Sequence, residues 1–116
     1  MGKRTDMKID FLYWALCPSH PQALDDLRQA MTELELDPSQ LTVREIATQE
    51  EADLEDFPGS PTIRIDGIDI EPADGPAQLT CRIYRRADGR ISPTPDPARV
   101  RAALAAAKNP DDRRNR

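Results

Sequence analysis

The sequence predicts an α/β domain with a central four-stranded mixed sheet flanked by helices. Two observations lead to this fold class. Residues 7–14, 41–46, 62–66 and 79–84 show the alternation or the apolar runs that are typical of strands. Helical patterns separate the first three of these stretches and follow the last. The resulting order is β-α-β-α-β-β-α, in which the first two strands are parallel and the final pair is antiparallel.

The first half of the chain contains two strands, each followed by a helix. Residues 7–14 alternate and then become apolar, as a buried central strand does. A helix follows over about residues 22–36, because large apolar side chains recur there at helical spacing: Leu24, Leu27, Met31 and Leu34. Residues 41–46 form the second strand. Residues 49–57 form a short acidic helix, which Thr48 caps.

The second half supplies the remaining strands. Residues 62–66 alternate cleanly and end at the turn signal Asp66-Gly67. Residues 68–70 continue in an extended conformation, and a loop rich in proline and glycine comes next. Residues 79–84 are then expected to be the last strand of the sheet.

Length and composition indicate one domain. A chain of 116 residues with 38% hydrophobic residues can bury one modest core. The domain covers residues 7–108 and closes with a helix over residues 97–108, for which Asp96 is the N-cap. Residues 1–6 are predicted to be a flexible leader, and residues 109–116 a disordered tail.

Charge and cysteine content limit the function classes. A net charge of −5 argues against nucleic acid as a partner. The start of the chain shows no secretory signal, and its apolar run is too short to cross a membrane, so the sequence predicts a cytoplasmic protein without a membrane partner. In that compartment two cysteines favour free thiols, catalysis or metal binding over a structural disulfide.

Cys17 lies where the first strand gives way to the first helix. Unpaired backbone N–H groups and the positive end of the helix dipole stabilise a thiolate at such a position. We therefore expect Cys17 to be an exposed, low-pKa nucleophile; the alternative is an inert, buried cysteine. His20 can stabilise the thiolate or donate a proton to a leaving thiol, or it can simply face solvent.

Two segments carry a resemblance to a known family. Cys17-Pro18-Ser19-His20 follows the first strand, and Gly59-Ser60-Pro61-Thr62 opens the third. With the element order, they make residues 7–107 similar to the thioredoxin/glutaredoxin superfamily. Residues 59–72 and the later Cys-Arg-Ile-Tyr-Arg segment resemble small bacterial thioredoxin-like proteins, some of which are labelled alkylmercury lyase-like.

The resemblance implies a thioredoxin-like fold and a site at Cys17. It makes Cys17 and His20 the catalytic residues and implies a cis peptide bond before Pro61, which frees the backbone of Ser60 to pair with a bound peptide or glutathione. Thr62 completes this substrate-binding loop. His20 stands where the family carries its second, resolving cysteine, so the resemblance implies a monothiol mechanism.

The remaining candidates have two interpretations each. Trp14 either lines the site or packs in the core. Cys81 is expected to share an apolar strand face with its neighbours and to be a core cysteine; the alternative is a second functional thiol. We expect it to lie too far from Cys17 for a disulfide, whose Cα atoms must be about 4.4–6.8 Å apart. An arginine cluster either binds an acidic ligand or is a solvated surface: Arg82, Arg85, Arg86 and Arg90.

Three functions are compatible with these residues. The first is a monothiol thiol-disulfide oxidoreductase acting on a protein or low-molecular-weight disulfide, with no bound cofactor and with glutathione as co-substrate. The second is a thiol-based protein that binds a soft metal such as mercury or a metalloid; one cysteine and one histidine are too few for structural zinc. The third is a non-catalytic thioredoxin-fold module that binds a partner through the Cys17 and Pro61 surface.

Overall fold

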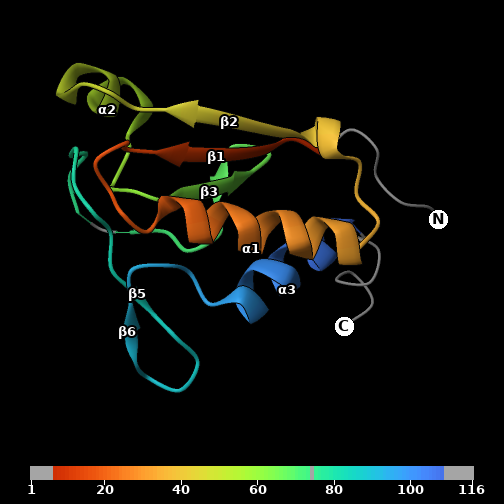
Figure 1. Cartoon of the computed structure of the whole chain (residues 1–116). Helices are drawn as coiled ribbons and strands as arrows, with labels where there is room; N and C mark the ends of the chain where they lie inside the picture. Colours follow the sequence, from red (N-terminus) through yellow and green to blue (C-terminus); the bar gives the residue numbers. More distant parts are fainter. Residues whose placement is uncertain (1–6, 74, 109–116) are drawn as a thin grey trace.

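The computed structural model describes residues 7–73 and 75–108 (Figure 1). The leader expected at residues 1–6 and the tail expected at residues 109–116 lie outside the described residues. The elements follow one another as β1 (Ile9–Tyr13), α1 (His20–Glu33), the 3-10 helix η1 (Pro38–Gln40), β2 (Leu41–Glu45), α2 (Gln49–Glu55), β3 (Thr62–Ile65), β4 (Ile68–Asp69), β5 (Tyr84–Arg85), β6 (Ile91–Ser92) and α3 (Pro97–Lys108).

The main sheet has four strands in the order β2-β1-β3-β4. β1 is parallel to β2 and antiparallel to β3, and β4 returns antiparallel to β3. Phe11 at the centre of β1 lies opposite Val43 on one side and Ile63 on the other. The prediction of a mixed four-stranded sheet with a parallel first pair is therefore confirmed.

The identity of the fourth strand was predicted wrongly. The sheet ends with the short β4, which the turn at Asp66 and Gly67 connects directly to β3. Residues 79–84 are not part of this sheet. They contribute one isolated bridge, between Ser60 and Cys81, and the beginning of a separate hairpin of β5 and β6. The turn signal thus decided the pairing, because it places the residues after it directly beside β3.

One face of the sheet packs against α1 and α3. Ile9 and Phe11 of β1 alternate toward this face and meet Leu27 of α1 and Leu104 of α3 in one buried cluster. Figure 1 shows the two helices side by side on this face. α3 has the predicted bounds, and its N-cap Asp96 accepts a hydrogen bond from the Ala98 N–H at 3.0 Å, as expected.

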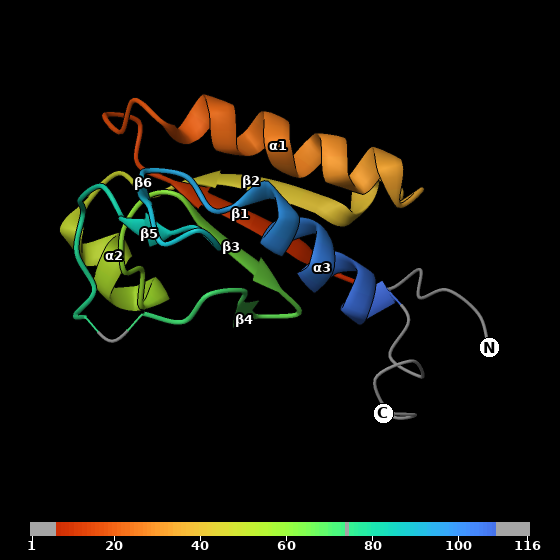
Figure 2. The same cartoon turned by 90° about the horizontal axis from the view of Figure 1, so that it is seen from below.

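The opposite face carries a smaller cluster with α2. Leu12 points away from the first cluster and packs with Ile46, Ala52 and Phe57. The predicted capping box of α2 is confirmed. The Thr48 hydroxyl accepts a hydrogen bond from the Glu51 N–H, and the Glu51 carboxylate accepts one from the Thr48 N–H. The β1–α1 loop, α2 and the β5–β6 hairpin gather at the left end of the molecule in both views (Figures 1 and 2).

Among the described residues, no helix is long and apolar enough to cross a membrane.

Candidate functional site

Cys17 lies in the turn between β1 and α1. Its N–H donates to the Trp14 carbonyl at 2.9 Å, which folds the chain back just before the helix begins. The residue is 1% exposed, so the expectation of an exposed sulfur is wrong. Leu16 and Pro18 on either side are exposed, however. The thiol therefore lies directly beneath the surface of a loop and not in the centre of the core.

The surroundings of the sulfur are polar. The Cys17 Sγ lies 3.1 Å from the Ser19 Oγ, and it donates to the Ser60 carbonyl at 3.6 Å. Ser19 is the N-cap residue of α1, but its hydroxyl does not cap the helix. The hydroxyl instead donates to the Pro93 carbonyl at 3.3 Å and faces the sulfur. The cap position thus provides a polar neighbour to the thiol.

The pKa of Cys17 lies below the ordinary cysteine value. Burial of the sulfur raises this pKa, but neighbouring polar groups that stabilise the thiolate outweigh the burial: the Ser19 hydroxyl and N–H, the Ser60 hydroxyl and the Cys81 thiol. The Ser60 Oγ is buried and, among the described residues, has no hydrogen-bond partner of ordinary geometry. An unsatisfied buried hydroxyl beside a thiol favours ionisation, because a thiolate gives this donor an acceptor.

The loop opposite Cys17 is built as the resemblance implies, with a cis peptide bond between Ser60 and Pro61. Its side chains are buried, and Thr62 is used within the loop: its hydroxyl donates to the Gly59 carbonyl at 2.7 Å and accepts from Arg82 at 3.1 Å. The Thr62 hydroxyl therefore has a structural role in this loop, and the substrate-binding role of the residue stays a prediction. Ser60 is the residue of this loop that reaches Cys17.

His20 and Trp14 lie near Cys17 in the chain but have other contacts. The His20 ring stacks on Tyr13, with 4.5 Å between ring centroids. The hydrogen bonds of the Cys17 sulfur go to Ser19 and Ser60, so the polar neighbour from the start of α1 is Ser19 and not His20. Trp14 is half-buried and packs against the cluster around Leu12, in agreement with its core interpretation.

Cys81 lies beside this site, and its exposure corrects one expectation. Its residue is exposed, whereas a core position was predicted. Cys81 also lies near Cys17, because it pairs with Ser60, whose carbonyl oxygen is 3.6 Å from the Cys17 sulfur. The Cys81 thiol lowers the pKa of Cys17, while burial and the Cys17 thiol raise the pKa of Cys81. Both cysteines are free thiols.

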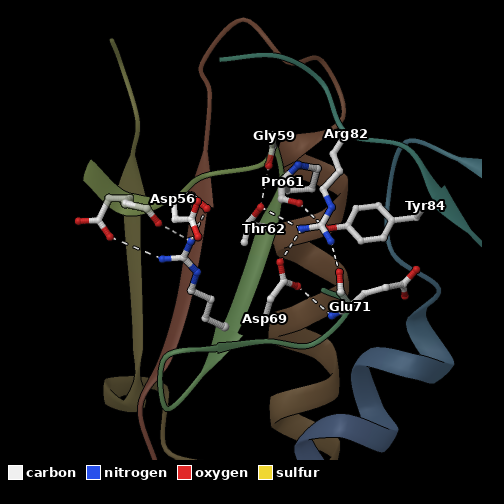
Figure 3. A network of polar contacts seen from close by, with 10 residues as sticks. Asp56, Gly59, Pro61, Thr62, Asp69, Glu71, Arg82 and Tyr84 are labelled. Atoms are coloured by element: carbon white, nitrogen blue, oxygen red, sulfur yellow. Dashed lines mark hydrogen bonds and ion pairs between the residues drawn. The ribbon is translucent and has the colours of Figure 1, made fainter. Parts of the chain in front are cut away.

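The side chains around Cys81 alternate between two faces, as predicted. The buried face, however, is the one opposite Cys81. Arg82 and Tyr84 point inward, and Ile83 is 72% exposed. A buried arginine is stable here because its charge is paired with a carboxylate and further hydrogen-bonded. Its guanidinium bonds Thr62 at 3.1 Å, Asp69 at 2.9 Å and the Glu71 carbonyl (Figure 3). Hydropathy alone favours burial of Ile83, but the polar partners stabilise a buried Arg82 and therefore place Ile83 on the exposed face.

The network around Arg82 holds residues 80–84 against the Pro61 loop. The guanidinium stacks over the Tyr84 ring at 4.6 Å from its centroid, and the Tyr84 hydroxyl donates to the Pro61 carbonyl (Figure 3). Gly59 allows the close approach. A Cβ there would lie 3.2 Å from the Arg82 Cβ, and the φ of +137° is unfavourable for other residues.

The arginine cluster expected from the sequence does not form one surface. Arg82 is buried in the network, Arg85 bonds the Gly89 carbonyl at 3.1 Å, and Arg90 pairs with Asp88 at 3.6 Å. The sequence predicted a role for the backbone of Ser60, but it assigned none to the hydroxyls of Ser19 and Ser60. Their signal was present in the positions next to the cysteine turn and before the proline, but serine there is too common to stand out.

Comparisons with known proteins add no identification. The chain matches no protein-family model, no curated protein and no solved structure. Within residues 7–73 and 75–108, no three His, Cys, Asp or Glu side chains are grouped so that they could hold a metal ion. The geometry around the two thiols is therefore the basis for a proposed function.

Proposed function

We propose that this protein is a thiol-disulfide oxidoreductase of thioredoxin-like fold in which Cys17 is the nucleophile. The observation that carries the proposal is the polar environment of the Cys17 sulfur, which lies 3.1 Å from the Ser19 hydroxyl and 3.6 Å from the carbonyl oxygen of Ser60, a residue whose own hydroxyl is buried without a partner among the described residues. A buried structural cysteine has no need of such donors, whereas a nucleophilic thiolate does. The order of the sheet and the position of the thiol before α1 also fit this fold.

The reaction is thiol-disulfide exchange. The Cys17 thiolate attacks one sulfur of a protein or low-molecular-weight disulfide and forms a mixed disulfide, while the other sulfur leaves as a thiolate. In the monothiol form of this mechanism, glutathione then attacks the mixed disulfide and regenerates Cys17. Because Cys17 is 1% exposed, the surface loop at Leu16 and Pro18 must move to admit the substrate.

The experiment is a coupled assay of glutathione-dependent reduction of a small mixed disulfide. We expect turnover by the native chain and its loss in Cys17→Ser, a substitution of nearly equal size. A Ser39→Ala variant is the control, since residue 39 is exposed in η1, far from the site in the chain. Equal turnover by the native chain and Cys17→Ser would contradict the proposal.

Soft-metal binding is the second candidate, and the pairing of the two thiols favours it. Two sulfur ligands are sufficient for a linear two-coordinate thiophilic ion, and thiolates are the ligands such ions prefer. Titration of the reduced chain with mercuric ion tests this function. We expect one equivalent to bind and to protect both thiols from alkylation. Binding that survives the loss of either cysteine contradicts a paired site.

A further inference from the structure

We infer that Cys81 is the resolving thiol of this site, so that the reaction passes through a disulfide between Cys17 and Cys81. The inference deepens the proposed function and rests on it. It replaces the external thiol of a monothiol mechanism with a thiol from the opposite side of the site. The sequence left Cys81 as an alternative second thiol, but favoured a core position for it and a large separation from Cys17.

The backbone fixes Cys81 opposite Ser60. The Ser60 N–H donates to the Thr80 carbonyl, and the Arg82 N–H donates to the Ser60 carbonyl, both at 2.8 Å. These two bonds lie on either side of Cys81 and form the isolated parallel bridge between Ser60 and Cys81. A residue held by bonds before and after it has little freedom to drift along the loop.

The same carbonyl brings the two cysteines together. The Ser60 oxygen that accepts from the Arg82 N–H also accepts from the Cys17 thiol at 3.6 Å. The Cys17 sulfur and the backbone next to Cys81 therefore meet at one oxygen atom, and the two thiols are close enough for each to shift the pKa of the other. Ser60 is therefore a shared support for the sulfur of one cysteine and for the backbone next to the other.

The network of buried side chains keeps this arrangement in place. Arg82, the next residue after Cys81, is anchored to Asp69 at 2.9 Å and to Thr62 at 3.1 Å (Figure 3). Cys81 itself remains exposed. A resolving thiol needs both properties, because it must be fixed near the nucleophile and must still be free to move by a rotation of its own side chain.

The chemistry balances with a disulfide as the oxidant. The Cys17 thiolate forms an S–S bond to one sulfur of glutathione disulfide, and the first glutathione leaves as a thiolate that takes up a proton. Cys81 then releases its proton to solvent and attacks the Cys17 sulfur. The bond between Cys17 and Cys81 forms, the mixed disulfide breaks, and the second glutathione leaves and is protonated. The two protein thiols are oxidised and one disulfide is reduced; an external dithiol returns the protein to its starting state.

The experiment follows the products formed when the fully reduced chain reacts anaerobically with glutathione disulfide. Intact mass, thiol counting and peptide mapping identify them. We expect the native chain to lose both thiols, to retain no glutathione and to contain a Cys17–Cys81 linkage. Cys81→Ser should instead accumulate a glutathione adduct on Cys17. Ile83→Ser is the matched control, since residue 83 is also exposed, and it should behave as the native chain does.

The possible outcomes distinguish the resolving role of Cys81 from the proposed thiol-disulfide exchange at Cys17. A stable adduct on Cys17 in the native chain, equal to that of Cys81→Ser, overturns the role of Cys81 and leaves the monothiol mechanism in place. Absence of any reaction at Cys17 in the native chain and in Cys81→Ser overturns both. Because Cys81 is exposed, its replacement by serine is not expected to unfold the chain, and a Cys81→Ala variant with the same products excludes an effect of the new hydroxyl.

Discussion

The buried guanidinium of Arg82 gives the most direct test of the structure, through the variant Arg82→Met. The Arg82 side chain is 6% exposed and its partner Asp69 is 15% exposed. Methionine fills much of the same volume but removes the charge and every hydrogen bond. Asp69 is then left without its cation, and the Glu71 carbonyl loses its donor.

The expected loss of folding free energy is about 3 kcal/mol. Removing one partner of a buried ion pair costs roughly 3–5 kcal/mol, and the partial exposure of Asp69 places this pair at the lower end of that range. Water that reaches the Asp69 carboxylate reduces the penalty, whereas loss of the stacking over Tyr84 adds to it. For a domain of this size the same loss lowers the melting temperature by roughly 12 °C.

The assay is urea unfolding at neutral pH under reducing conditions. Arg85→Met is the control, because Arg85 is exposed and its side chain bonds the carbonyl of a neighbouring turn residue, Gly89; its change should stay within about 0.5 kcal/mol. Adding Asp69→Asn to Arg82→Met should recover about 1 kcal/mol, since the uncompensated charge is then removed. An Arg82→Met variant as stable as Arg85→Met would refute the description of this network as a stabilising one.

Three further predictions concern the thiol, the Pro61 loop and a helix cap. The reaction of Cys17 with iodoacetamide, measured in a Cys81→Ser background, should speed up with pH through a pKa below that of free cysteine, because only the thiolate reacts. Ser19→Ala should move this pKa upward, because it removes the hydroxyl beside the sulfur. An unchanged pH profile in that variant contradicts the role of the hydroxyl. Gly59→Ala should cost roughly 2 kcal/mol in urea unfolding, because of the positive φ and the 3.2 Å approach of the new Cβ to Arg82; no measurable cost contradicts the close approach. Thr48→Ala should cost about 1 kcal/mol by loss of the capping box, whereas Thr48→Ser should retain most of the stability.

The local structure was largely readable from the chain. The bounds of α3, the capping box of α2 and the strand at residues 62–65 followed from signals within a few residues of each element. Such signals work because caps, turns and amphipathic spacing act through neighbours in the sequence. The sequence likewise placed Cys17 at the junction of a strand and a helix.

The sequence by itself thus determined the first three strands of the sheet, the helices and the position of Cys17 between β1 and α1. Tertiary structure alone decided which face of residues 79–84 is buried and where Cys81 lies. Hydropathy favours an inward Ile83, but the partners that satisfy a buried Arg82 come from β3, β4 and the loop after it, which only the folded chain brings together. The burial of a charge depends on groups distant in sequence, and the position of the second thiol follows from that burial.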